Sequence, residues 1–178
     1  GLMYGFVTDG FYKIDEFDYN TTTSVYTIKP GIAANGVYGA PQPGSLKWKD
    51  LNGDGVITAD SDRQIIGNAN PKFTGGWSNQ LTYKSFDLSV FVNFVVGNDI
   101  YNANKLEWTD GAFPNLNTLE IVKNRFTYIN SAGVRVTDPI ELEKMNANAE
   151  IWTPVRVQRW WLHSWAIEDG SYLRFNNI

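Results

Sequence analysis

The side chains of a β-strand point alternately to its two faces, so an alternating sequence predicts a strand with one apolar face. Residues 73–83 follow this pattern, and their apolar side consists of Phe73, Trp77, Leu81 and Tyr83, with Gly75 and Asn79 between them. Residues 86–96 follow it as well, with an apolar side made of Phe86, Leu88, Val90, Val92, Phe94 and Val96. Because only Lys84 and Ser85 separate the two stretches, the pattern predicts an antiparallel hairpin.

Two environments suit such a hairpin. Half-buried hairpins of soluble β-sandwiches alternate in the same way. In a transmembrane barrel, a strand of about 11 residues, at roughly 3.3 Å per residue and a tilt near 45°, covers the apolar band of about 25 Å. The small and polar residues of the second face suit a wet barrel interior, and the two-residue turn suits the short connections at one rim. These features favour the barrel.

Long connections surround the hairpin. The residues from Gly97 to about Ala166 separate it from a last predicted strand in EDGSYLRFNNI, and connections of this length usually have a function. Within this connection we expect a short helix from Asn117 and a second one that is capped by Asp138 and has Pro139 at its first position. The sequence therefore predicts an all-β fold with long loops that contain short helices.

Composition excludes several classes of protein. The chain has 178 residues, of which 43% are hydrophobic, and its 15 basic and 19 acidic side chains form no long run of one sign, which argues against nucleic acid as a partner. No apolar stretch approaches the roughly 18 residues of a membrane-spanning helix. The chain has no cysteine and a single histidine, His163, and Glu141 and Glu143 are spaced so that they do not face each other on a helix. We therefore expect no enzyme activity and no organic cofactor.

One motif suggests a metal ion. Asp50, Asn52 and Asp54, followed by Gly55, form the DxNxDG opening of a calcium loop, in which oxygen atoms converge on one centre. Position 12, where an EF-hand has glutamate, is Ser61, and Asp60 and Asp62 lie on either side of it. We expect Asp62 to be the closing ligand and Asp60 to be the second choice, because an extra residue can bulge outward and still let a later carboxylate return to the ion. Ca²⁺ is the predicted ion, with Mg²⁺ as the runner-up. The alternative is a tight polar turn held by bonds from side chain to backbone.

Tryptophan is concentrated near the end of the chain, where Trp152, Trp160, Trp161 and Trp165 lie within fourteen residues. Flat rings of this kind stack on sugars or anchor a partner. The alternative, which we favour, is that they pack the base of the outer loop and join an aromatic girdle at the membrane interface.

Several motifs in a fixed order resemble one family. The order of GSLKWKDLNGDGVI, DRQIIGNANPKFTGGWSNQLTYKSFDLSVFVNFVVGNDIYN, WTP and EDGSYLRFNNI, from Gly44 to Ile178, resembles the C-terminal part of SusC/RagA-type TonB-dependent outer-membrane transporters. The weaker YGFVTDGFY near the start fits as well. The family pattern places the closing aspartate of the metal-like loop just before an arginine, which corresponds to Asp62 before Arg63, with one extra residue between Gly55 and Asp62.

This resemblance implies more than composition does. It implies a fold class of antiparallel transmembrane β-barrel section with long extracellular loops, in which residues 1–178 are a fragment that lacks the plug and the N-terminal strands. It implies TonB-dependent import of glycan or peptide fragments across the outer membrane of a Gram-negative cell. The implied partners are a SusD-like surface lipoprotein, outer-membrane lipid, an oligosaccharide or peptide ligand, and TonB through the missing N-terminal part. The turn at Lys84 and Ser85 would be periplasmic, and residues 50–62 and 97–166 would be extracellular.

A second function remains open at this stage. A secreted, calcium-stabilised soluble β domain that binds carbohydrate through exposed tryptophan would account for the metal-like loop. The two hypotheses differ in what covers the apolar face of the hairpin, which is lipid in the first and a protein core in the second.

Overall fold

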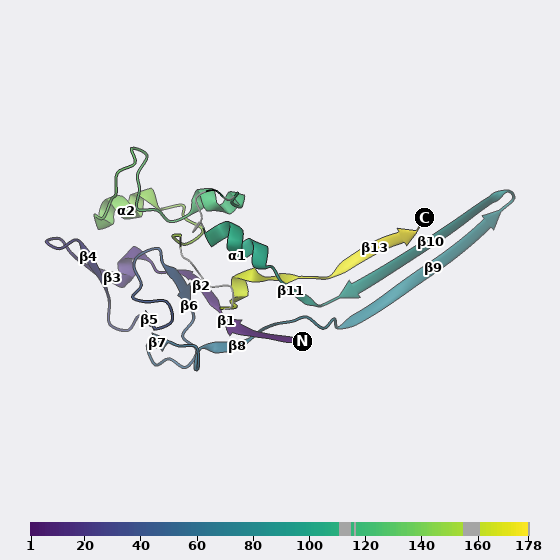
Figure 1. The fold of residues 1–178 in the computed structure, drawn as a ribbon, viewed down its shortest axis with the longest axis horizontal. Helices are drawn as coiled ribbons and strands as arrows, with labels where there is room; N and C mark the ends of the chain where they lie inside the picture. The colour runs from purple at the N-terminus through teal and green to yellow at the C-terminus, as the bar shows by residue number, and fades with distance from the viewer. Residues whose placement is uncertain (111–114, 116, 155–160, 178) are drawn as a thin grey trace.

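A computed structural model describes residues 1–110, 115, 117–154 and 161–177. A long β-hairpin projects from a lobe of short strands and helices (Figure 1). Its strands are β9, Phe73–Tyr83, and β10, Phe86–Val96, joined by Lys84 and Ser85. They pair in register from Tyr83 opposite Phe86 to Phe73 opposite Val96. The predicted hairpin is therefore confirmed, together with its turn and its bounds.

A third strand joins this hairpin. Strand β13, Tyr172–Asn177, pairs antiparallel with β10, with an irregularity between Phe91 and Val92, so the sheet has the order β13-β10-β9. Residues directly opposite each other in an antiparallel pair share a face. Val92 therefore lies between Trp77 and Phe175 on the apolar face, and Asn93 lies between Gly76 and Arg174 on the other.

Two short strand pairs continue the sheet at the end away from the turn. Strand β1, Leu2–Phe6, pairs with β8, Arg63–Asn68, which leads into β9. Strand β11, Asp99–Tyr101, follows β10 and pairs with β12, Ile167–Asp169, which leads into β13. The chain between β1 and β8, which includes residues 50–62, and the connection 97–166 consequently leave and re-enter this part of the sheet at the same end (Figure 1).

The rest of the lobe is assembled from small pieces. Strand β2, Thr8–Phe11, pairs with β6, Leu46–Trp48, and β3, Phe17–Asn20, pairs with β4, Val25–Ile28. The two-residue strands β5, Ala34–Asn35, and β7, Val56–Ile57, pair in parallel. A 3-10 helix, η1, covers Ile14–Glu16.

Helices are short and lie mostly in the connection 97–166. Helix α2, Pro139–Met145, begins as predicted, because the carboxylate of Asp138 accepts bonds from the N–H groups of Ile140 and Glu141. The helix expected from Asn117 is instead the 3-10 helix η2, Glu120–Asn124. It starts later because Leu119 is extended and donates its N–H to the carbonyl of Trp108. Helix α1, Ala103–Asp110, was not predicted, and η3 covers Ser164–Ala166.

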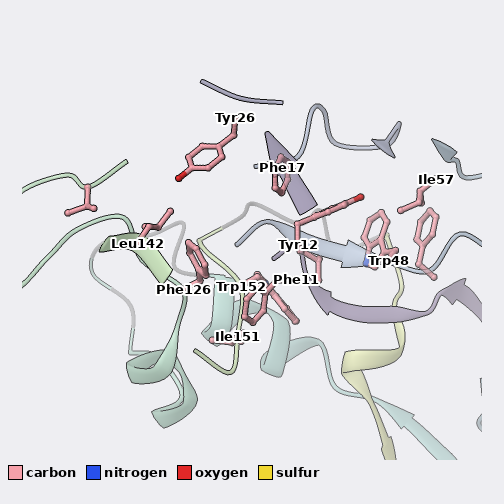
Figure 2. Packing of buried hydrophobic residues seen from close by; sticks show 13 residues of the cluster. Phe11, Tyr12, Phe17, Tyr26, Trp48, Ile57, Phe126, Leu142, Ile151 and Trp152 are labelled. Carbon is pink, nitrogen blue, oxygen red and sulfur yellow. The ribbon is translucent and has the colours of Figure 1, made fainter. Parts of the chain in front are cut away.

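A core rich in aromatic side chains fills the lobe. The labelled side chains form a band from Leu142 of α2 to Ile57 of β7, and Phe11, Tyr12 and Trp152 lie between them (Figure 2). The rings of Phe6 and Trp48 stack with centroids 4.0 Å apart. Because the strands of the lobe are too short to bury much surface alone, this core holds them together.

These elements make the described chain mostly strand with few helices, as an all-β fold requires. The described strands form several small sheets and do not close into a barrel. In the same residues, no helix is both long and apolar enough to span a bilayer.

Candidate functional site

The predicted metal loop forms a tight turn after β6. One carboxylate oxygen of Asp50 accepts the N–H of Gly53 at 2.7 Å, and the other accepts the N–H of Gly55 at 2.9 Å. Gly53 and Gly55 have φ angles of 75° and 85°, in the left-handed region that glycine adopts without steric cost. The residue types of the motif therefore fix the path of the backbone.

Asn52 and Asp54 complete the turn. The carboxylate of Asp54 accepts the side-chain amide of Asn52 at 2.8 Å and the N–H of Val56 at 2.8 Å, while the Oδ1 of Asn52 accepts the N–H of Asp54 at 3.2 Å. The bonds from Asn52 and Val56 lower the pKa of the Asp54 carboxyl, because both stabilise its charged form. The turn thus keeps the carboxylate of Asp54 exposed to solvent and favours its charged form.

Asp62 lies at the base of the same loop and is completely buried. Its Oδ1 accepts the N–H of Leu51 at 2.8 Å and its Oδ2 accepts the N–H of Thr58 at 2.7 Å. The carboxylate therefore connects the beginning of the loop to its end. This is the role expected of a closing residue, whether or not an ion is bound. Asp60 is exposed.

The structure thus brings Asp50, Asn52 and Asp54 into one turn and places Asp62 beneath it. Their oxygens accept backbone N–H groups, as the tight-turn alternative requires. Nowhere among the described residues do three His, Cys, Asp or Glu side chains gather in a way that would hold a metal ion. The oxygens keep further lone pairs, so the calcium assignment stays a prediction.

Three of the four clustered tryptophans pack into the lobe. Trp152 is buried and contacts Trp165 edge to face, with ring centroids 5.3 Å apart. Trp161 contacts Trp48 in the same manner at 5.8 Å. These three rings support the packing alternative; Trp160 lies outside the described residues.

His163 has a structural role that the sequence did not reveal. It is buried between Trp48 and Trp152, and its Nδ1 lies 2.8 Å from the hydroxyl of Thr8. The N–H of Thr8 also donates to the hydroxyl of Ser164. The side chain thus joins the segment before β12 to β2. Burial lowers the pKa of His163 to about 4, so the ring is neutral at pH 7.

Most of the apolar face of the three-stranded sheet is exposed, while Val92 at its centre is buried. Phe86 is 79% exposed and Tyr83 70%. Further exposed apolar residues on this face are Phe73, Trp77, Leu81, Leu88, Leu173 and Phe175. The opposite face carries mainly Thr, Ser, Gln, Asp and Asn side chains and Arg174, together with the apolar or aromatic side chains of Phe91, Val95 and Tyr172. A sheet with so many exposed apolar side chains on one face needs an apolar environment on that side.

Comparison with known proteins shows that the chain is similar to a segment of TonB-dependent receptors. It is 31% identical to TonB-dependent receptor P3 of Formosa agariphila over 179 residues, which cover 100% of this chain and 14% of that receptor. From the same organism, TonB-dependent receptor P39 is 35% identical over 57% of this chain, and TonB-dependent receptor P26 is 37% identical over 40%. The chain spans 14%, 12% and 7% of the lengths of these relatives. No protein-family model matches it.

Proposed function

We propose that this chain, which corresponds to a segment of a TonB-dependent receptor, forms part of the barrel wall and the outer loops of an outer-membrane nutrient transporter. The observation that carries this proposal is the three-stranded sheet with one exposed apolar face and one polar face. The chemistry supplied by such a segment is passive, because a wall and loops bind and guide a solute without forming or breaking a bond.

Lipid is the best cover for the apolar face. Soluble monomers rarely expose contiguous apolar patches larger than a few hundred Å², whereas barrel strands present apolar side chains to acyl chains and polar ones to the lumen. Strands β9 and β13 form the two edges of the sheet. In a bilayer, unpaired backbone groups are too costly to leave at an edge, so both edges are expected to pair with further strands of a closed barrel.

The lobe then forms outer loops. With the turn at Lys84 and Ser85 in the periplasm, the connections 50–62 and 97–166 lie outside the cell, since both are at the opposite end of the sheet (Figure 1). In this arrangement the loops contact a SusD-like surface lipoprotein and the incoming glycan or peptide, as the SusC/RagA resemblance implies. TonB acts through the N-terminal part of the receptor.

Calcium binding by the turn at 50–62 belongs to the same proposal. Asp50, Asn52 and Asp54 offer only oxygen atoms, which suit Ca²⁺ and, with more waters, Mg²⁺. Asp62 would be a ligand only if its carboxylate bound the ion while still accepting the N–H groups of Leu51 and Thr58. The carbohydrate-binding alternative has less support, because Trp152, Trp161 and Trp165 pack inside the lobe.

Paired arginine substitutions test the membrane assignment. Val90 and Ser89 are neighbours near the middle of β10, where Val90 lies opposite Asn79 on the apolar face and Ser89 opposite Gln80 on the polar face. In the complete receptor, Val90→Arg should destabilise the barrel by about 2–4 kcal/mol, and Ser89→Arg by much less, because only the first places a charge in lipid. Asn93 is a poorer control, since Arg174 lies directly opposite.

Assembly in the outer membrane can be followed by the heat-dependent electrophoretic mobility of the barrel, and stability by urea titration in lipid vesicles. We expect assembled Val90→Arg receptor to be depleted and Ser89→Arg receptor to be close to wild type. Equal losses in the two variants, or a greater loss for Ser89→Arg, would contradict a lipid-facing side at Val90.

A further inference from the structure

A cavity of about 600 Å³ lies between the turn that contains Asp50, Asn52 and Asp54, here called the calcium-like turn, and the strands β2 and β6. Its volume is in the range of small-molecule sites, roughly 300–1,000 Å³. Its described walls come from four segments of the lobe: Asp9, residues 31–33, residues 47–50 and residues 53–55. None of these residues belongs to the three-stranded sheet.

Backbone and side-chain bonds hold these walls in place. The N–H of Ala34 donates to the carbonyl of Gly55 at 2.9 Å, and the N–H of Lys49 donates to the carbonyl of Val7 at 2.9 Å. The hydroxyl of Tyr12 donates to the carbonyl of Ala33 at 2.7 Å. The cavity is therefore formed before any ligand arrives, which reduces the entropy lost on binding.

Charges of both signs line this cavity. Lys47 is committed to an ion pair with Glu16. Lys49 is exposed and forms no ion pair within the described part of the chain. The side chain of Asp9 is 58% exposed and lies 4.0 Å from the ammonium of Lys47. The carboxylates of Asp50 and Asp54 add negative charge from the turn.

Aromatic stacking is not available in the described lining. Trp48 is its one aromatic residue, and that side chain is completely buried against Phe6. Ile32 and Ala33 supply aliphatic surface instead. Sugar-binding sites commonly use an exposed ring, whereas a zwitterion needs a cation and an anion on either side of an aliphatic surface.

We propose that this cavity is a binding site for short peptides with free termini, in which Lys49 receives the α-carboxylate and Asp9 the α-ammonium. The inference rests on the proposed transport function and selects peptide over glycan as the substrate class at this site. Asp50 and Asp54 of the calcium-like turn also line the cavity. A cation bound to these two carboxylates would therefore weaken the attraction between the cavity and the α-ammonium group of the peptide. Peptide affinity should therefore be higher in EDTA than in calcium.

Calorimetric titration of the complete receptor in detergent tests this proposal. The probes are tri-alanine, its N-acetyl and C-amide derivatives, and maltotriose. Tri-alanine should bind, and blocking either terminus should weaken binding about tenfold, as expected for the loss of one charge-assisted hydrogen bond. Maltotriose should not bind at this site.

Variants connect the binding to the cavity. Lys49→Gln should reduce the affinity for tri-alanine about tenfold and leave the affinity for its C-amide derivative unchanged. Asp9→Asn should likewise reduce the affinity for tri-alanine about tenfold and leave the affinity for its N-acetyl derivative unchanged. Lys144→Gln and Asp18→Asn, which alter exposed charges outside the cavity, are the matched controls. Heat-dependent mobility of the same samples reports barrel assembly, so failure of the transporter proposal is distinguished from failure of this one.

Four results would overturn the proposal. The first is absence of tri-alanine binding by an assembled receptor. The second is equal binding of free and blocked peptides. The third is tri-alanine binding that Lys49→Gln and Asp9→Asn leave unchanged. The fourth is maltotriose binding as strong as that of tri-alanine.

Discussion

Gly44 occupies a position where a single added methyl group should loosen the lobe. Its φ angle is 80°, its N–H donates to the carbonyl of Tyr12 at 2.7 Å, and its carbonyl accepts the N–H of Thr153 at 2.8 Å. A Cβ at this position would lie 2.3 Å from Cδ1 and 2.4 Å from Cγ of Phe126. Gly44→Ala therefore introduces both backbone strain and a collision.

The Phe126 ring has little room to move. It is 2% exposed and contacts the rings of Phe11 and Tyr128 edge to face, with both centroids at 5.7 Å. Overpacking of a core of this kind costs about 1–3 kcal/mol. The left-handed backbone adds about 1–2 kcal/mol for alanine, and the smaller entropy of the unfolded alanine chain offsets about 0.4–1 kcal/mol. The expected destabilisation is about 2–4 kcal/mol.

Gly10 provides a matched control. Its φ angle is 74°, but a Cβ there would meet nothing within 4 Å. Gly10→Ala should therefore show the backbone effect alone, about 1 kcal/mol or less. The difference between the two variants measures the collision with Phe126.

Hydrogen exchange of the complete receptor, followed by mass spectrometry, measures local opening without requiring the lobe to unfold by itself. Peptides that contain the Thr153 and Phe126 amides should exchange roughly 5- to 150-fold faster in Gly44→Ala than in Gly10→Ala. Equal exchange in the two variants would refute the close packing of Gly44 against Phe126.

Two further predictions concern the lobe. Because burial lowers the pKa of His163 to about 4 while the unfolded ring keeps a value near 6.5, the unfolded state binds more protons between these values, and stability should fall as the pH falls from 6.5 towards 4. Between pH 7 and 5 the stability should fall by about 2 kcal/mol. Hydrogen exchange should show this as lost protection of the Thr8 and Trp165 amides. If a His163→Gln variant has the same pH dependence, titration of His163 is not the cause. Asp62→Asn, which sets an amide against the N–H of Leu51 or Thr58, should destabilise the loop by about 1–3 kcal/mol even in EDTA. Proteolysis of the 50–62 loop measures this effect, Asp60→Asn is the control, and a defect that appears only when calcium is present would instead make Asp62 purely an ion ligand.

The hairpin could be predicted from the sequence because its information is local. Eleven alternating residues on each side of a two-residue turn fix both the pairing and the face of every side chain. The start of α2 was predictable for the same reason, since Asp138 and Pro139 act on the next three residues. Helix α1 had a comparable signal, because the side chain of Asn102 accepts the N–H of Lys105 at 3.0 Å, as an N-cap does.

The lobe could not be predicted in this way. Its strands have two to six residues, which is too short for a period to be recognised, and their partners are distant, as when β2 pairs with β6. A sequence motif also does not show the direction in which a side chain points. The spacing located Asp50, Asn52, Asp54 and Asp62, but whether a carboxylate points to an ion or to an N–H depends on the folded backbone. His163 carried no signal, because its bond to Thr8 joins residues 155 positions apart.

The boundary between sheet and lobe explains how one chain can combine a regular wall with irregular loops. Strand β10 ends at Val96, and the next residue, Gly97, has a φ angle of 76° and donates its N–H to the hydroxyl of Ser171, immediately before β13. At the same level, the N–H of Lys72 donates to the carbonyl of Val96, and the N–H of Gly170 donates to the carbonyl of Asn98. All three strands of the sheet are therefore interrupted together, and their pairing is completed at that level by local bonds. The register of β9, β10 and β13 is made by backbone pairing among these three strands themselves. Substitutions around the cavity or the calcium-like turn should therefore change binding while leaving the strand pairing of the wall intact.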